Sequence, residues 1–88
     1  MTSQDDIQTQ VAEIWARHLG VGRVTGDDNF FALGGHSLLG VKMIAAVQAK
    51  LNLGDELKPA DLLEFPTLAE FSAHVQALAA PSEEFGEI

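Results

Sequence analysis

The sequence predicts an all-α fold, a small bundle of three long helices and one short helix. Apolar residues recur at helical spacing near residues 4–19, 37–52 and 67–80, and no segment alternates as a strand would. The chain has 88 residues, of which 47% are hydrophobic and 20% charged, so it is long enough for a single globular domain. We therefore expect one compact helical domain.

The first helix is predicted from about residue 4 to residue 19. Acidic residues stand in its first turn and basic residues in its last turn, where both complement the helix dipole, and Gly20 follows as a C-terminal cap. One apolar stripe should face the core, and it consists of Ile7, Val11, Ile14, Trp15 and Leu19.

A long connection without clear periodicity runs from residue 20 to residue 36. It is rich in glycine, and connections of more than about 12–15 residues in small domains are commonly functional or disordered. Disorder is disfavoured here because apolar side chains can pin the segment to the core. We expect this of Val24, Phe30, Phe31 and Leu33, and we expect both phenylalanines to be buried.

The second helix is predicted from Ser37 to about Asn52, and its two faces differ. At about 3.6 residues per turn, most of the larger side chains fall on the face that should point inward, made of Gly40, Met43, Ile44, Val47 and Leu51. The opposite face is small, apolar and slightly basic, with Leu38, Lys42, Ala45 and Ala49, flanked by Val41. Glycine inside a helix costs about 1 kcal/mol relative to alanine, so we expect Gly40 to permit the close approach of another helix.

A short helix is predicted at Pro59–Glu64, because proline suits its first turn and Pro66 bars its continuation. The last helix begins at the capping box TLAE, in which Thr67 and Glu70 each satisfy a free amide, and it extends as far as Ala80.

We expect residues 1–80 to form the domain. Pro81 ends the last helix, and residues 81–88 are expected to be an acidic flexible tail or the start of a linker. We expect the protein to be a monomer.

Composition disfavours several classes of protein. The formal net charge of −8, from 13 acidic and 5 basic residues, repels nucleic acid. Cysteine is absent and the three histidines lie far apart, so neither thiol chemistry nor a metal site is expected. No apolar run approaches the roughly 20 residues of a membrane span, and the N-terminus lacks the basic start of a signal peptide. We therefore expect a cytoplasmic protein that does not bind membranes.

The segment NFFALGGHSLLG, residues 29–40, contains a serine with three possible roles. As a nucleophile, Ser37 would need a G-x-S-x-G turn after a strand, but the next glycine comes one position late and no strand precedes it. The adjacent His36 would also be a poorly aimed base. As a helix N-cap, serine stabilises by about 1 kcal/mol over alanine, yet capping alone leaves the preceding glycine pair unexplained.

Covalent attachment of a phosphate-linked group to Ser37 agrees with more of its surroundings. The start of a helix presents free amides and a partial positive charge, which favour a phosphate. No acidic residue lies between Asp28 and Asp55, whereas Lys42 and Lys50 do. The preceding glycines would leave the hydroxyl open to a modifying enzyme, and a group carrier needs no deep cleft of its own.

The run DNFFALGGHSLLGVKMIAAV resembles the thiolation motif of peptidyl carrier proteins from nonribosomal peptide synthetases, and LLEFPTLAEFSAHV resembles their third helix and the start of their fourth. The resemblance covers about residues 5–80 and implies a four-helix bundle of the acyl-carrier type. It also implies that a phosphopantetheinyl transferase uses coenzyme A to attach 4′-phosphopantetheine to Ser37. The cofactor-binding surroundings would then be Gly35, His36 and Leu38. One departure is Gly40, where such domains often have alanine.

The resemblance implies a carrier of aminoacyl or peptidyl thioesters without catalytic activity of its own. Its partners would be an adenylation domain and condensation, thioesterase or tailoring enzymes. We expect docking mainly through apolar contacts, on a surface made of Leu38, Val41, Lys42 and Ala45. His36 has two possible roles: it orients the arm or its phosphate, or it only packs or faces solvent.

Two other classes of protein share some of these features. An acyl carrier protein of polyketide or fatty acid synthesis has the same fold and cofactor, but typically has D-S-L where this chain has His36-Ser37-Leu38. A helical adaptor that binds a partner helix in an apolar groove would have the same periodicity, but it leaves the GGHS element without a role. The sequence is compatible with a freestanding carrier and with one cut from a longer synthetase.

Overall fold

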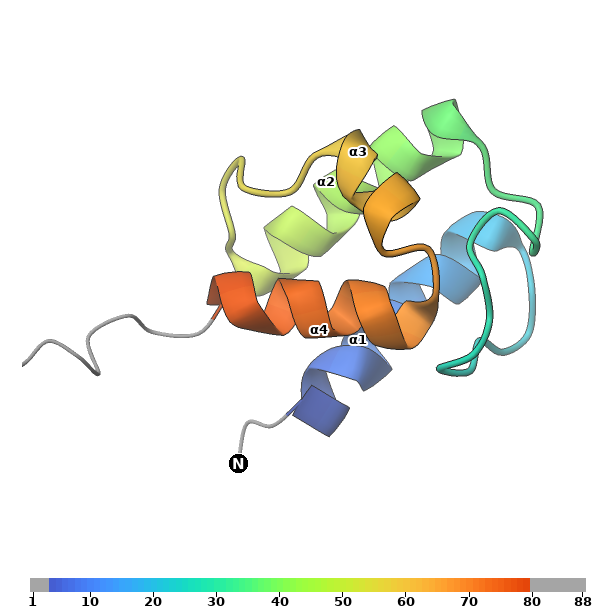
Figure 1. Cartoon of the computed structure of the whole chain (residues 1–88), viewed down its shortest axis with the longest axis horizontal. Helices are drawn as coiled ribbons and strands as arrows, with labels where there is room; N and C mark the ends of the chain where they lie inside the picture. Colours follow the sequence, from blue (N-terminus) through green and yellow to red (C-terminus); the bar gives the residue numbers. More distant parts are fainter. Residues whose placement is uncertain (1–3, 80–88) are drawn as a thin grey trace, which may run out of the picture.

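The computed structural model describes residues 4–79, which contain four α-helices (Figure 1). These are α1 (Gln4–Leu19), α2 (Ser37–Leu51), α3 (Pro59–Glu64) and α4 (Leu68–Ala79). The predicted all-α, four-helix architecture is confirmed. None of these helices is long and apolar enough to cross a membrane. The predicted end of the last helix at Ala80 and the predicted tail, 81–88, lie outside the described residues.

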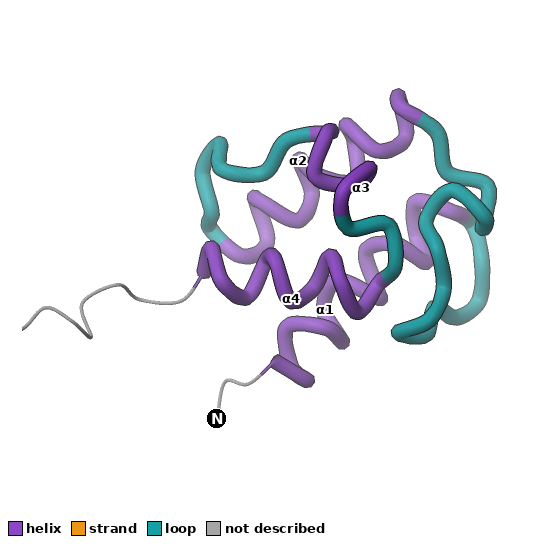
Figure 2. The backbone as a smooth tube through the Cα atoms, in the orientation of Figure 1, coloured by secondary structure: helices purple, strands orange, loops and turns teal. Residues whose placement is uncertain are grey.

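α1 packs against both α2 and α4, and α3 packs against α2. Figure 2 shows the long connection between α1 and α2 folded over one end of the bundle. The short helix α3 lies in the segment that joins α2 to α4. This arrangement brings the start of α2 and the short α3 to the same side of the molecule.

Local signals set the helix ends. Asn52 has the left-handed conformation, with φ 59° and ψ 47°, and caps α2, which therefore ends at Leu51. The capping box predicted before α4 is confirmed: Glu70 N donates to Thr67 Oγ1 at 3.2 Å, and Thr67 N donates to Glu70 Oε1 at 3.3 Å.

Three aromatic rings form the centre of the core. Trp15, Phe30 and Phe71 are fully buried, and the Trp15 ring lies 5.2 Å from Phe30 and 5.8 Å from Phe71 between centroids. Each such pair contributes about 0.5–1.5 kcal/mol beyond the burial of its area. Because the three residues come from α1, the long connection and α4, they hold those segments together. Around them pack aliphatic side chains that include Val11, Met43, Val47, Leu62, Leu68 and Val75.

The connection between α1 and α2 is tied to the start of α4 by its backbone. Leu68 N donates to Asp28 O at 2.9 Å, and Ala69 N donates to Gly26 O at 3.0 Å. These bonds satisfy amides that the first turn of a helix cannot satisfy internally. The loop and α4 therefore stabilise each other.

The prediction that apolar residues pin this connection is confirmed for Val24 and Phe30, which are buried, and Leu33 is partly buried. It is wrong for Phe31, which is 36% exposed. The side chain of Asn29 accepts a hydrogen bond from Phe31 N and so forms a turn at this point. The Phe30 ring therefore enters the core, whereas the Phe31 ring lies against the outer edge of the Phe30 ring, with 5.4 Å between their centroids.

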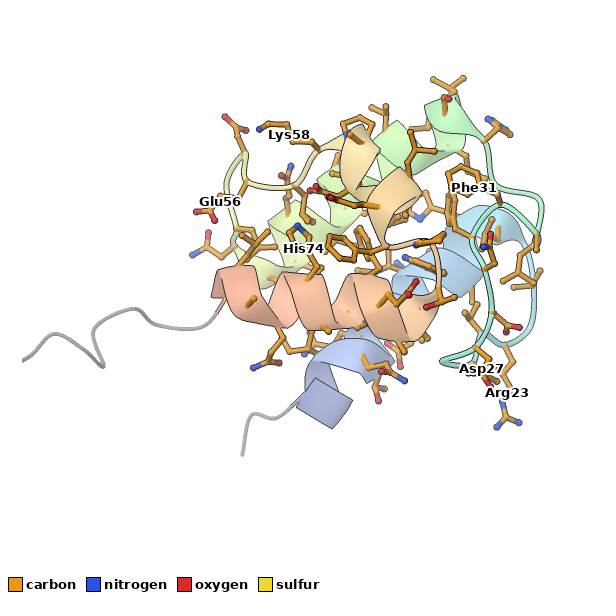
Figure 3. The ribbon with its side chains drawn as sticks, viewed as in Figure 1. Arg23, Asp27, Phe31, Glu56, Lys58 and His74 are labelled. Atoms are coloured by element: carbon orange, nitrogen blue, oxygen red, sulfur yellow. The ribbon has the colours of Figure 1, made fainter. Side chains whose placement is uncertain are left out.

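His74, on α4, contacts two side chains on or next to α3. Its Nε2 lies 3.2 Å from Asp61 Oδ2, and its ring stacks on Phe65 with 4.7 Å between centroids. Figure 3 labels His74 on α4, and both of its partners lie on α3 or directly after it. Asp61 also accepts a hydrogen bond from Lys58 N at 2.9 Å, so it anchors the start of α3 at the same time.

We predict that His74→Ala lowers the free energy of unfolding by about 1 kcal/mol, because it removes one ring stack and one partly exposed contact with the Asp61 side chain. Urea denaturation followed by circular dichroism measures this change. His18→Ala is the control, because the His18 ring bonds to Ile14 O within α1 and its removal leaves the α3–α4 contact in place. Equal stability of His74→Ala and the parent protein would contradict the prediction.

Candidate functional site

Ser37 is the first residue of α2, and the residue that caps the helix is His36. His36 has extended backbone, with φ −147° and ψ 176°, and its Nδ1 accepts from Leu39 N at 3.3 Å. The alternative in which Ser37 acts as the N-cap is therefore wrong. The imidazole supplies the acceptor that the serine hydroxyl would otherwise supply.

This hydrogen bond gives His36 a role that the sequence did not predict. The acceptor nitrogen is engaged with an amide of its own helix. Ser37, the next residue, is exposed at the surface.

The two glycines before His36 have separate structural reasons. Gly34 has φ +104°, a conformation that side chains disfavour. Gly35 lies against the Phe30 ring, so that a Cβ at this position would overlap the ring. Gly35 N also donates to Phe30 O at 3.0 Å. The glycine pair thus lets the chain turn tightly over a buried ring just before Ser37.

Asn29 shapes the beginning of the same segment, and sequence reasoning gave it no such role. Its Oδ1 accepts from Phe31 N at 2.8 Å and from Ala32 N at 3.1 Å, while its backbone forms an isolated bridge with Thr67. An asparagine in a segment without helical periodicity is the signal that could have found it, because its side chain commonly bonds to backbone amides two or three residues ahead.

A pocket of about 200 Å³ lies directly beside Ser37. Its remaining walls come from the long connection, the start of α2 and α3, and consist of Phe31, His36, Gly40, Pro59, Ala60, Leu62 and Leu63. Leu62 is buried, whereas Leu63 is 73% exposed. The sequence did not predict this pocket, because it depends on the packing of α3 against α2.

Gly40 makes that packing possible. A Cβ added to Gly40 would lie 2.9 Å from Leu62 Cδ1, which is closer than real contacts allow. The predicted close approach of another helix at Gly40 is thereby confirmed, and the partner helix is α3.

The outer face of α2 is an apolar surface next to Ser37. Leu38 is 62% exposed and Val41 is 48% exposed, and Lys42 and Ala45 are exposed as well. All four residues predicted for docking therefore stand at the surface. Phe31 and Leu63, which were not among them, extend the apolar surface to the loop and to α3 (Figure 3 labels Phe31).

The surroundings of Ser37 fit a phosphate ester. The residue is exposed at the first turn of a helix 15 residues long, where free amides and the helix dipole favour an anion. α2 contains no acidic residue, so no carboxylate on that helix opposes a bound phosphate.

Residues 9–75 match the sequence model of a family described as "Phosphopantetheine attachment site". The chain belongs to this family. The family binds 4′-phosphopantetheine, so the predicted cofactor is confirmed at the level of the family. The chain is a carrier domain of this type.

Relatives of the carrier domain lie within large synthetases. Malpibaldin synthetase of Mortierella alpina is 44% identical over 84 residues, which are 94% of this chain and 2% of that protein. Surfactin synthase subunit 2 of Bacillus subtilis is 41% identical over 73 residues, which are 83% of this chain and 2% of that protein. The carrier domain thus spans only a small part of these relatives.

The fold is also similar to that of solved carrier proteins. BlmI, a type-II acyl carrier protein from Streptomyces verticillus involved in bleomycin biosynthesis, matches with a TM-score of 0.79 and 32% sequence identity, over 88% of this chain and 90% of that chain. The predicted acyl-carrier type of bundle is confirmed.

We predict that Gly35→Ala destabilises the carrier domain by about 1–3 kcal/mol, because the added methyl group overlaps the buried Phe30 ring. Gly22→Ala is a matched control in the same connection, since no atom lies within 4 Å of its added Cβ. Urea denaturation of both variants measures the difference. Equal losses in the two variants would show that the contact with Phe30 does not explain Gly35.

Proposed function

We propose that this carrier domain bears 4′-phosphopantetheine on Ser37 and carries aminoacyl or peptidyl thioesters in nonribosomal peptide synthesis. The observation that supports this most directly is the exposed serine at the first turn of α2, within the residues that match the family. A tripeptide synthetase among its relatives and the similarity to a solved domain titled "Non Ribosomal PCP domain" support the choice of an aminoacyl or peptidyl group over a fatty acyl group.

Attachment requires an external transferase and coenzyme A. Ser37 Oγ bonds to the phosphorus that bears the pantetheine arm, the bond from that phosphorus to the bridging oxygen of the pyrophosphate breaks, and 3′,5′-ADP leaves. The hydroxyl proton passes to a base of the transferase. When bound, the arm supplies a terminal thiol on which acyl groups are held as thioesters.

The residues around Ser37 contribute position and electrostatics. Amides of the first turn of α2 and the helix dipole stabilise a nearby phosphate by about 0.3–1 kcal/mol at an exposed site. His36 holds the first turn in place through its bond to Leu39 N. Gly35 sets the course of the chain into the helix by its contact with the Phe30 ring.

A carrier without catalytic activity of its own agrees with this geometry. A serine nucleophile needs a base whose free nitrogen is aimed at the hydroxyl and whose ring is oriented by a third group. His36 instead directs Nδ1 to the amide of Leu39. Chemistry on the carried group is therefore assigned to partner enzymes.

Partners dock on the outer face of α2 and the apolar residues beside it. Leu38, Val41, Lys42 and Ala45 are exposed, and the first two present large apolar side chains. Exposed apolar patches of this kind are typical of interaction sites. The partners of this surface are the phosphopantetheinyl transferase, an adenylation domain, and condensation, thioesterase or tailoring enzymes. The carrier itself is a monomer, and it works in the cytoplasm.

We predict that incubation with coenzyme A and a broad-specificity phosphopantetheinyl transferase adds one phosphopantetheinyl group, as measured by intact mass spectrometry. Ser37→Ala should show no addition, and its circular dichroism spectrum should match that of the parent, because Ser37 is exposed and His36 caps the helix. Addition to Ser37→Ala, or none to the parent protein, would overturn the proposal.

We predict that Leu38→Asp weakens binding of a cognate adenylation or condensation partner about tenfold or more, which is about 1.4 kcal/mol. Ala49→Asp is the control, because it adds the same charge to an exposed position near the other end of α2. Isothermal titration calorimetry measures both affinities. The affinity of the parent protein should change little between low and moderate salt concentration. A steep loss of affinity with salt, together with unchanged binding of Leu38→Asp, would contradict apolar docking.

A further inference from the structure

A groove separate from the pocket beside Ser37 lies between α1 and residues 22–26 of the long connection. We propose that it is a docking site for the acidic segment 81–88 of the same chain, which follows the described residues. The groove has a volume of about 420 Å³, within the range of roughly 300–1,000 Å³ that ligand pockets occupy. It shares no residue with the predicted docking surface on α2. The inference goes beyond the proposed function and does not rest on it.

The α1 wall of the groove is made of small side chains. Ala12 and Ala16 line it, and both are half-buried against the core. An apolar side chain laid on these two residues would remove apolar surface from water, which stabilises the contact. Phe85 is the one aromatic residue of the segment 81–88, so it is the side chain that suits this wall.

The loop wall of the groove offers free backbone groups. Gly22 and Arg23 are exposed, and their amides and carbonyls form no hydrogen bond within residues 4–79. An extended peptide can pair with such groups through its own main chain, as in the recognition of peptides by strand addition. The groove therefore favours an extended peptide as its occupant.

Charge favours an acidic peptide with its carboxylates on the loop side. Arg23 is the basic residue among those that line the groove, and it forms no ion pair within the described part of the chain. Figure 3 shows its side chain extending outward from the loop. Glu13, on the α1 wall, would repel an acidic residue there. Because successive side chains of an extended peptide point to opposite sides, Glu84 can face Arg23 while Phe85 faces α1.

The segment is long enough to reach the groove. α4 has 12 residues and is therefore about 17 Å long, and its first residue, Leu68, lines the groove. The six residues from Ala80 to Phe85 span about 20 Å when extended. The segment can thus run back beside α4 and bring Phe85 to the groove. In that position it covers none of the residues of the docking surface on α2, so partners retain access to Ser37.

The covalent connection makes a weak contact sufficient. A segment tethered to the end of α4 has a high effective concentration at the groove, so little intrinsic affinity is needed to occupy it. An open groove with two half-buried alanines is adequate for this role.

The test compares the whole chain with a chain that ends at Ala80, by NMR of the backbone amides. We expect the truncation to shift the amide signals of Ala12 and Gly22 and to leave that of Ala45, on α2, unchanged. In the whole chain we expect nuclear Overhauser effects (NOEs) from the Phe85 ring to the Ala12 methyl group. Groove signals that do not respond to the truncation would overturn the inference.

Charge variants separate docking from stability. Arg23→Glu should abolish the NOEs, because it puts a carboxylate opposite Glu84. Lys50→Glu is the matched control: it makes the same change of charge at an exposed position that does not line the groove, and it should leave the NOEs in place. Combining Arg23→Glu with Glu84→Arg should restore them. NOEs that persist in Arg23→Glu, or that the charge exchange fails to restore, would overturn the pairing of Arg23 with Glu84.

Other occupants of the groove give different results. NOEs that weaken on dilution would mean that the segment comes from a second copy of the chain, which would overturn docking within one chain. Groove signals that ignore the truncation but shift when an adenylation partner is added would assign the groove to that partner and also overturn the inference. Failure of Ser37 to gain a phosphopantetheinyl group, measured by intact mass on the same samples, would overturn the proposed function alone.

Discussion

The burial of the Phe30 ring is the interaction on which the position of Ser37 depends. The ring packs edge-on against Trp15 with 5.2 Å between centroids, and it lies against Gly35 so closely that only glycine fits there. Phe30 therefore fixes the connection between α1 and α2 at one point, and the chain passes over it directly into the first turn of α2. A loop of this length can hold a serine in one fixed position only if it is anchored to the core, as Phe30 anchors it here.

Several features of the fold follow from local sequence signals. The capping box at Thr67 and Pro59 at the start of α3 act within a single turn, so their structural effect can be predicted without tertiary information. The inward face of α2 is equally local, because the period of the helix decides which side chains share a face. Met43, Ile44 and Val47 are all buried there, as predicted.

The features that were missed depend on contacts between distant segments or on competition between neighbours. Phe30 and Phe31 are equivalent by composition, and only the turn at Asn29 decides which one enters the core. Serine is a better N-cap than histidine by propensity, yet His36 takes that position because the chain is extended at residue 36. The pocket beside Ser37 needs α3 in place, and residues 40 and 62 meet only after folding.

The backbone bonds between the loop and α4 bear on protein engineering by module exchange. Because the carbonyl groups of Gly26 and Asp28 receive the first amides of α4, the attachment loop and the last helix share one hydrogen-bonded junction. A graft of the loop and α2 alone into a foreign scaffold would leave these acceptors without their donors. The smallest transplantable unit consequently extends from α1 through α4, and recombination boundaries belong outside it.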